Sequence, residues 1–157
     1  MQELADVLID VVEGGASVGF MLPITRERAL RFWQMVANDV EKSERAVLVA
    51  RDAQGVITGT AQLILAMPDN QPHRADLAKM QVHRRVRRQG LAQQLLLAAE
   101  SWAKALGKTV LVLDTVTGSD ASRIYERCGW QKVGEIPNYA LWPQGDLCAT
   151  TYYYRIL

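Results

Sequence analysis

The chain has 157 residues, a length typical of one domain, so we expect a single domain spanning residues 1–157. Hydrophobic residues make up 49% and charged residues 22%, which excludes a disordered chain, and no apolar run reaches the ~18 residues of a membrane span. The net charge is only +1, and four of the 18 basic residues lie between positions 84 and 88, so the sequence lacks the extended basic surface of a nucleic-acid-binding protein.

The two cysteines, Cys128 and Cys148, have neither the spacing of a zinc site nor that of a disulfide framework. The acidic N-terminus lacks the basic start of a signal peptide. His73 and His83 have no partners at ligand or triad spacing and are interpreted as surface residues. We therefore expect a cytoplasmic protein with reduced thiols and no metal.

The first half of the chain is predicted to form two helices and then three strands. Leu4, Leu8 and Val11 have helical spacing, and Thr25 is a suitable cap for a second helix. Apolar or alternating runs separated by turn residues predict the strands. The expected elements, in order, are helices over 4–13 and 26–43 and strands over 45–52, 56–66 and 73–82.

The second half alternates helices and strands and ends in two strands. Leu91, Leu95 and Trp102 lie on one helical face, and Ser119 can cap a short helix. The run TVLVLD (109–114) is almost wholly apolar, which predicts a central strand buried on both faces. The expected elements are helices over 91–106 and 120–128 and strands over 109–114, 130–136 and 149–156, with a long loop before the last strand. This order predicts an α/β (α+β) sandwich with a mixed sheet covered by helices.

The stretch RRVRRQGLA (84–92) lies between a predicted strand and a predicted helix. A helix N-terminus has unpaired N–H groups and a partial positive charge, which together bind phosphate. Gly90 lets the backbone turn, Ala92 keeps the next position small, and Arg87 and Arg88 add guanidinium groups. The alternative is an exposed basic loop that only caps a helix.

Two motifs resemble the GNAT superfamily of acyltransferases. VHRRVRRQGLAQQLL resembles its acetyl-CoA-binding motif, Q/R-x-x-G-x-G/A, and SDASRIYERCGW resembles the later helix that carries a tyrosine near the cofactor thiol. The resemblance implies the GNAT fold, with helices on both faces of a mixed sheet that splays between the family's fourth and fifth strands at Gln81-Val82. The family's first strand is missing here, because the chain starts at a helix, and Ala92 replaces the motif's last Gly.

The resemblance implies that acetyl-CoA is the co-substrate and that a small-molecule primary amine is the acceptor. GGASVGFM, RADLAKM, LDTVTGS, VGEIPNYA and TTYYYRIL are similar to segments of superfamily members that acetylate an amino-acid-like toxin. Two alternatives remain open: acetylation of protein N-termini or lysines, and a non-catalytic acyl-CoA-binding regulatory domain. The resemblance implies neither a nucleic-acid nor a membrane partner, and it allows for a homodimer.

The cofactor site implied by the resemblance combines backbone and side-chain groups. Backbone N–H groups near the splay would hold the thioester carbonyl, and those of the basic stretch would hold the pyrophosphate. Ser122 would face the cofactor, although a plain helix serine is an equal interpretation. The implied cofactor-binding residues are Gln81, Val82, Arg87, Arg88, Gln89, Gly90, Leu91, Ala92 and Ser122.

Three residues are candidates for the chemistry. An amine with a pKa near 10 must lose a proton before it attacks, and Asp76 or Asp114 can accept that proton directly or through water. Tyr125 matches the family's general acid for the departing thiolate. The alternatives are a solvated charge paired with Arg74 for Asp76, a carboxylate that caps a loop for Asp114, and core packing for Tyr125.

The acceptor pocket is predicted from the loop GGASVGF and from the long loop before the last strand. Ser17 and Phe20 are expected to line this pocket, and Tyr139 and Trp142 to close it. The alternative is that these aromatic side chains only seal the end of the sheet.

Overall fold

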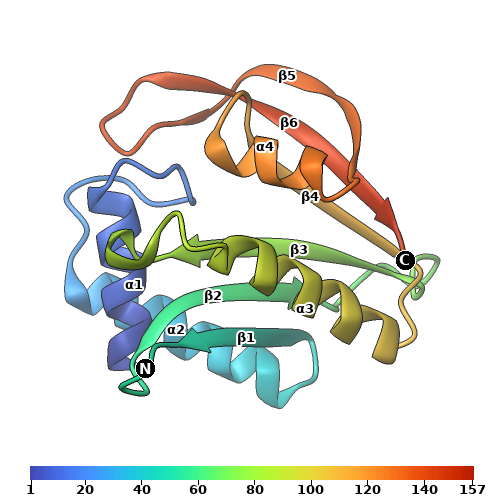
Figure 1. Ribbon diagram of the computed structural model, residues 1–157, viewed down its shortest axis with the longest axis horizontal. Helices are drawn as coiled ribbons and strands as arrows, with labels where there is room; N and C mark the ends of the chain where they lie inside the picture. Colours follow the sequence, from blue (N-terminus) through green and yellow to red (C-terminus); the bar gives the residue numbers. More distant parts are fainter.

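Six strands form one sheet in the order β1-β2-β3-β4-β6-β5 (Figure 1). The computed structural model describes residues 1–157. Neighbouring strands are antiparallel, except for β3 and β4, which are parallel. The strands are β1 (Arg45–Arg51), β2 (Ile57–Ile64), β3 (Arg74–Val82), β4 (Val110–Val116), β5 (Gln131–Leu141) and β6 (Leu147–Ile156).

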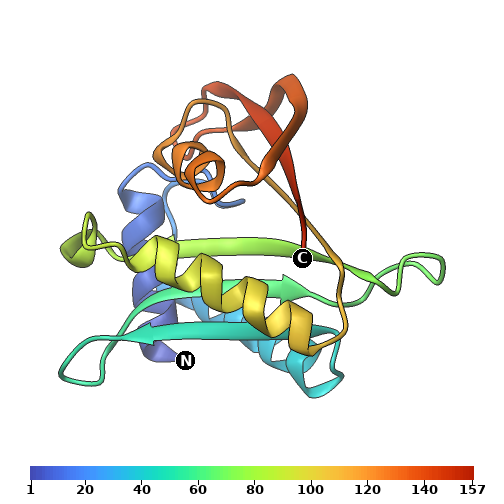
Figure 2. The ribbon, with the colours of Figure 1, turned by 45° about the vertical axis from the view of Figure 1, so that its right-hand side comes forward.

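Four α-helices cover the two faces of this sheet, as the sequence predicts. Figure 2 shows α3 and α4 on one face and α1 and α2 on the other. Their bounds are α1 (Gln2–Glu13), α2 (Arg26–Glu41), α3 (Leu91–Ala105) and α4 (Asp120–Arg127), and a short 3-10 helix, η1 (Arg84–Val86), precedes α3. No strand precedes α1, and β1 forms the edge of the sheet. None of the helices has the length and apolar character needed to cross a membrane.

Local sequence signals determine the helix ends. The hydroxyl of Thr25 accepts a hydrogen bond from the Arg28 N–H at 3.2 Å, and that of Ser119 accepts one from the Ser122 N–H at 3.2 Å. Gly107 and Gly129 follow the ends of α3 and α4 with φ of 75° and 81°. The predicted caps of α2 and α4 are therefore confirmed.

The prediction that β4 is buried on both faces is wrong. Leu111 and Leu113 are buried in the main core, whereas Val112 is only partly buried and Asp114 is exposed. Helices α3 and α4 cover one face of this part of the sheet, while α1 and α2 lie against β1, β2 and β3 (Figure 2). The apolar run therefore does not indicate burial on its second face.

The last hairpin also differs from the prediction. Strand β5 continues to Leu141 because two register shifts let it keep pairing with β6, so only Trp142 to Asp146 form the connecting loop. Tyr139 consequently lies on a strand, and Trp142 lies at the start of the loop.

The parallel pair β3 and β4 separates along its length. Only Arg74, Ala75 and Asp76 pair with Val110, Leu111 and Val112. Beyond these pairs the strands diverge, so the opening begins earlier than the predicted point at Gln81-Val82. Next to it, a bulge places two β3 residues, Lys79 and Met80, opposite the single residue Ala61 of β2.

Candidate functional site

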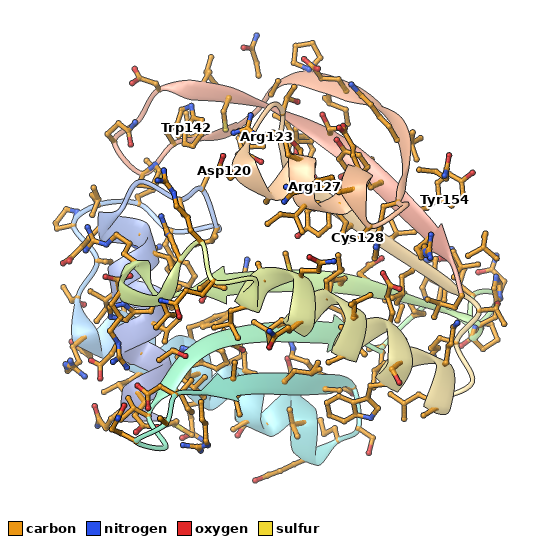
Figure 3. The ribbon with its side chains drawn as sticks, in the orientation of Figure 1. Asp120, Arg123, Arg127, Cys128, Trp142 and Tyr154 are labelled. Atoms are coloured by element: carbon orange, nitrogen blue, oxygen red, sulfur yellow. The ribbon has the colours of Figure 1, made fainter.

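A cavity of about 1060 Å³ occupies the opening between β3 and β4. Its walls come from the loop 14–19, the end of β3, the turn into α3, helix α4 and the β5–β6 hairpin. Figure 3 shows Asp120, Arg123 and Arg127 along α4 above this opening, and Trp142 at the start of the β5–β6 loop. The lining residues that the sequence predicted are Ser17, Gln81, Val82, Arg87, Arg88, Gly90, Leu91, Ala92, Asp114, Tyr125, Tyr139 and Trp142.

One end of the cavity is a row of free backbone donors. The N–H groups of residues 88–93 have no acceptor within the protein, and the first helical bond of α3 runs from the Gln94 N–H to the Gly90 carbonyl. Arg88 and Gly90 both adopt left-handed backbone conformations, with φ of 61° and 78°. Alternating backbone conformations of this kind turn successive N–H groups toward one point and form an anion-binding concavity. This end of the cavity can hold phosphate oxygens.

The arginines of the basic stretch have different roles. Arg84 and Arg85 form ion pairs with Asp10 of α1 and with Asp52 of the β1–β2 turn, at 2.9 and 2.8 Å. They therefore tie the turn to the rest of the protein and do not face the cavity. The Arg87 Nε donates a hydrogen bond to the Val82 carbonyl at 3.2 Å, and Arg88 lines the cavity.

Tyr125 lies where the cavity meets the main core. Its side chain is 5% exposed, and its ring packs against Trp130 and Tyr153 with centroids 5.8 and 6.0 Å away. Its hydroxyl has no hydrogen-bond partner within the protein. Burial, assisted by the negative charge of Asp114, raises the pKa of Tyr125 well above its usual value. The hydroxyl therefore stays protonated and can donate a hydrogen bond into the cavity.

The structure places the two candidate carboxylates, Asp114 and Asp76, in different surroundings. Asp114 lines the cavity, and its Oδ2 lies 3.2 Å from the Thr150 hydroxyl, whose proton is shared between this carboxylate and the Thr115 carbonyl at 2.9 Å. Asp76 forms an ion pair with Arg74 and does not line the cavity. Its geometry matches the alternative of a paired, solvated charge, so of these two candidates only Asp114 lines the cavity.

The loop after α1 forms another wall of the cavity. The Ser17 hydroxyl donates to the Leu141 carbonyl at 2.8 Å, and the Leu22 N–H donates to the Pro143 carbonyl at 2.9 Å. These bonds connect the N-terminal loop with the β5–β6 hairpin, a contact that Figure 1 also shows. The hydroxyls of Tyr139 and Tyr152 lie 2.7 Å apart.

Three further predicted site residues lie outside the cavity lining. Phe20 is buried, with its ring 5.2 Å from that of Phe32. It belongs to a second hydrophobic core, which is formed mainly by side chains of α1 and α2. The Ser122 hydroxyl donates to the Ser119 carbonyl at 2.8 Å, as expected of a plain helix serine. Gln89 is exposed.

The polar residues that line the cavity and that the sequence analysis missed include Lys79, Arg127 and Thr150. Lys79 interrupts the apolar alternation of β3, and this interruption was the available signal for a bulge. Arg127 lies one turn after Arg123 on α4, so a helical projection would have placed both on one face. The position of Thr150 in the cavity wall depends on the pairing of β6 with β4, which the sequence does not reveal.

Comparison with known proteins finds curated relatives with clear sequence similarity. The chain is 37% identical over 116 residues to an uncharacterized N-acetyltransferase in the hisH-hisA intergenic region of Azospirillum brasilense; the match covers 73% of this chain and 67% of that protein.

Solved structures share the fold at lower identity. Ribosomal-protein-alanine N-acetyltransferase from Brucella melitensis superposes with a TM-score of 0.79 at 22% identity, over 98% of this chain and 92% of the other. The protein yncA from Salmonella typhimurium, solved with its cofactor acetyl-CoA, also has a TM-score of 0.79, at 20% identity over 98% and 86% of the two chains. The model of the acetyltransferase (GNAT) family matches residues 18–130, most of the chain. With the opened parallel pair and the free N–H groups before α3, this match shows that the chain belongs to the acetyltransferase (GNAT) family.

Proposed function

We propose that the protein transfers an acetyl group from acetyl-CoA to the primary amine of a small molecule, by direct attack while both substrates are bound. The observation that carries this proposal is a single cavity lined both by a row of free backbone N–H groups suited to phosphate and by a carboxylate, Asp114. The solved relative yncA contains acetyl-CoA, which supports the choice of co-substrate. We propose that the single domain acts in the cytoplasm, where acetyl-CoA is available.

The residues present fit acetyl-CoA. The N–H groups of residues 88–93 would hold its pyrophosphate, and Arg88 and Arg127, which also line the cavity, contribute positive charge. Gln81 and Val82, which line the cavity at the end of β3, would lie beside the pantetheine arm. When bound, acetyl-CoA supplies the acetyl group as an activated thioester.

Asp114 and Tyr125 would perform the two proton-related steps. Asp114, oriented by Thr150, accepts the proton of the acceptor ammonium directly or through one water. Tyr125 keeps its proton because burial raises its pKa, so it stabilises the departing thiolate by donating a hydrogen bond. Complete proton transfer from Tyr125 to sulfur is less favourable, because a thiol is the stronger acid.

We propose an amino-acid-like toxin or antibiotic as the acceptor. The support is the similarity of five segments to the tabtoxin-resistance acetyltransferase of plant-pathogenic bacteria, including GGASVGFM, which contributes to the cavity wall. The Ser17–Leu141 and Leu22–Pro143 hydrogen bonds join the loop after α1 to the β5–β6 hairpin. They restrict the part of the cavity beside this loop, which we call the acceptor end, and so favour a small molecule over an extended peptide.

The decisive test measures thiol release from acetyl-CoA with a panel of amino acids, β-lactam amino acids, polyamines and N-terminal peptides. We expect thiol release with small amines and none with peptides. Turnover only with peptides would instead support protein acetylation, the activity named for the Brucella relative. Acetyl-CoA binding without turnover on any acceptor would support a regulatory binding domain.

A further inference from the structure

Lys79 occupies an unusual position in the wall of the cavity. It lies in the bulge of β3 opposite Ala61, and its backbone is left-handed with φ of 49°, a conformation that costs free energy for a non-glycine residue. Without the bulge, the alternation of β3 would give its side chain another direction. The strained backbone therefore sets where the side chain of Lys79 points.

The ammonium of Lys79 lies against the loop after α1, at the acceptor end. A Cβ added at Gly19 would lie 3.2 Å from Lys79 Nζ, and both residues line the cavity. Gly19 itself has φ of 86°, so the absence of a side chain there leaves the ammonium accessible from the cavity.

No protein group pairs with this ammonium. Lys79 has no hydrogen bond and no carboxylate within 4.0 Å, although its side chain is largely withdrawn from solvent. Burial lowers the pKa of Lys79, and the charge of Arg45 lowers it further, while the charge of Asp114 partly opposes both effects. A largely buried cation without an ion-pair partner costs free energy, so Lys79 is better explained by a ligand than by packing.

The cavity therefore carries two opposite charges at its acceptor end. Asp114 can attract an ammonium, and Lys79 can attract a carboxylate; they are near enough for each to influence the other but too distant to form an ion pair. A zwitterion with both groups would satisfy both residues without leaving either charge unpaired.

Building on the proposed function, we propose that Lys79 is the specificity-determining residue that binds a carboxylate of the acceptor. The enzyme would then select amines that also carry a carboxylate and reject the corresponding amides. Lys79 would contribute to the binding of the acceptor and not to that of acetyl-CoA.

The test compares Lys79→Met, which keeps the length of the side chain and removes its charge, with Lys132→Met on the exposed strand β5. Acceptors are used as pairs: each α-amino acid of the panel and its carboxamide. We expect the wild-type protein to prefer the acid at least tenfold in kcat/KM. Lys79→Met should raise the KM for the acid about tenfold and abolish the preference, with the KM for acetyl-CoA unchanged. Lys132→Met should behave like the wild-type protein.

The proposal is overturned if the wild-type protein uses acids and amides equally, or if Lys79→Met lowers kcat for both to the same extent. Calorimetric binding of the same pairs to the CoA-bound protein provides a second readout. If no acceptor releases thiol, the proposed function fails. Preferential binding of acids that Lys79→Met abolishes would still support the carboxylate site, and equal binding of acids and amides would refute it. Circular dichroism and the melting temperature check that both variants fold.

Discussion

At the scale of single residues, Tyr125 can be tested by removing only its hydroxyl. Because burial raises the pKa of Tyr125, its hydroxyl stays protonated, and in the proposed mechanism it would donate a hydrogen bond to the developing thiolate. A hydrogen bond to a charged group contributes about 1.5–3 kcal/mol, so Tyr125→Phe should lower kcat roughly 10- to 100-fold with little change in the KM for acetyl-CoA. The matched control is Tyr154→Phe on β6, outside the cavity lining. An unchanged kcat in Tyr125→Phe would remove this residue from the mechanism.

Single substitutions can also decide whether Asp114 or Asp76 accepts the proton of the acceptor amine. Asp114→Asn keeps an acceptor for the Thr150 hydroxyl but cannot take a proton, so kcat at pH 7 should fall by about 10²-fold. Raising the pH populates the neutral amine, and the variant should then recover part of its activity. Asp76→Asn should stay within about threefold of wild type, because Asp76 only pairs with Arg74. Pre-steady-state and steady-state rates across pH 6–10 would distinguish the two, and the opposite ranking would make Asp76 the base.

At the scale of elements, we expect phosphate binding by the turn before α3 to depend more on its backbone geometry than on the number of its arginines. Gly90 has φ of 78°, and a Cβ added there meets no atom within 4 Å, so a substitution acts through strain and not through collision. Valine in this conformation costs about 1–2 kcal/mol, so Gly90→Val should raise the KM for acetyl-CoA about tenfold. Arg85→Ala should change it less than twofold, because Arg85 pairs with Asp52. A larger effect for Arg85→Ala would show that side-chain charge dominates phosphate binding.

The same turn is tied to α1 through Asp10, which accepts hydrogen bonds from the backbone and side chain of Arg84 at 2.8 and 2.9 Å. Burial opposes the charge of Asp10, but these hydrogen bonds and the nearby His83 and Arg84 outweigh it and lower its pKa below 3.8. A carboxylate with a lowered pKa stabilises the fold above its unfolded pKa, and this contribution disappears as the pH falls through the folded value. Asp10→Asn should therefore destabilise the protein by about 1–2 kcal/mol at pH 7 in urea unfolding. The difference from wild type should shrink as the pH falls below 3.8 and through the lowered pKa of Asp10, and a difference independent of pH would exclude this ion pair as its source.

At the scale of the whole molecule, the sequence predicts features with local causes and misses those that depend on strand pairing. The caps Thr25 and Ser119 act within a few residues, and both were predicted at their positions. The left-handed backbone of Lys79, by contrast, depends on which residues of β2 it faces. Phe20 and Gly19 are adjacent in the sequence, yet one is buried in the second core and the other lines the cavity; no local pattern distinguishes them.

The two halves of the sheet are joined through only three residue pairs of β3 and β4, and the cavity lies between them. A ligand that contacts both the turn before α3 and helix α4 would connect these halves in the native state alone. Acetyl-CoA at 100 times its Kd should therefore stabilise the protein by about 2.7 kcal/mol, measured as a higher melting temperature. Hydrogen exchange should slow at the N–H groups of residues 88–93, which have no acceptor in the free protein, and much less at β1. Gly90→Val should show a reduced melting shift at the same concentration. A melting shift without protection of residues 88–93 would place the cofactor outside this cavity.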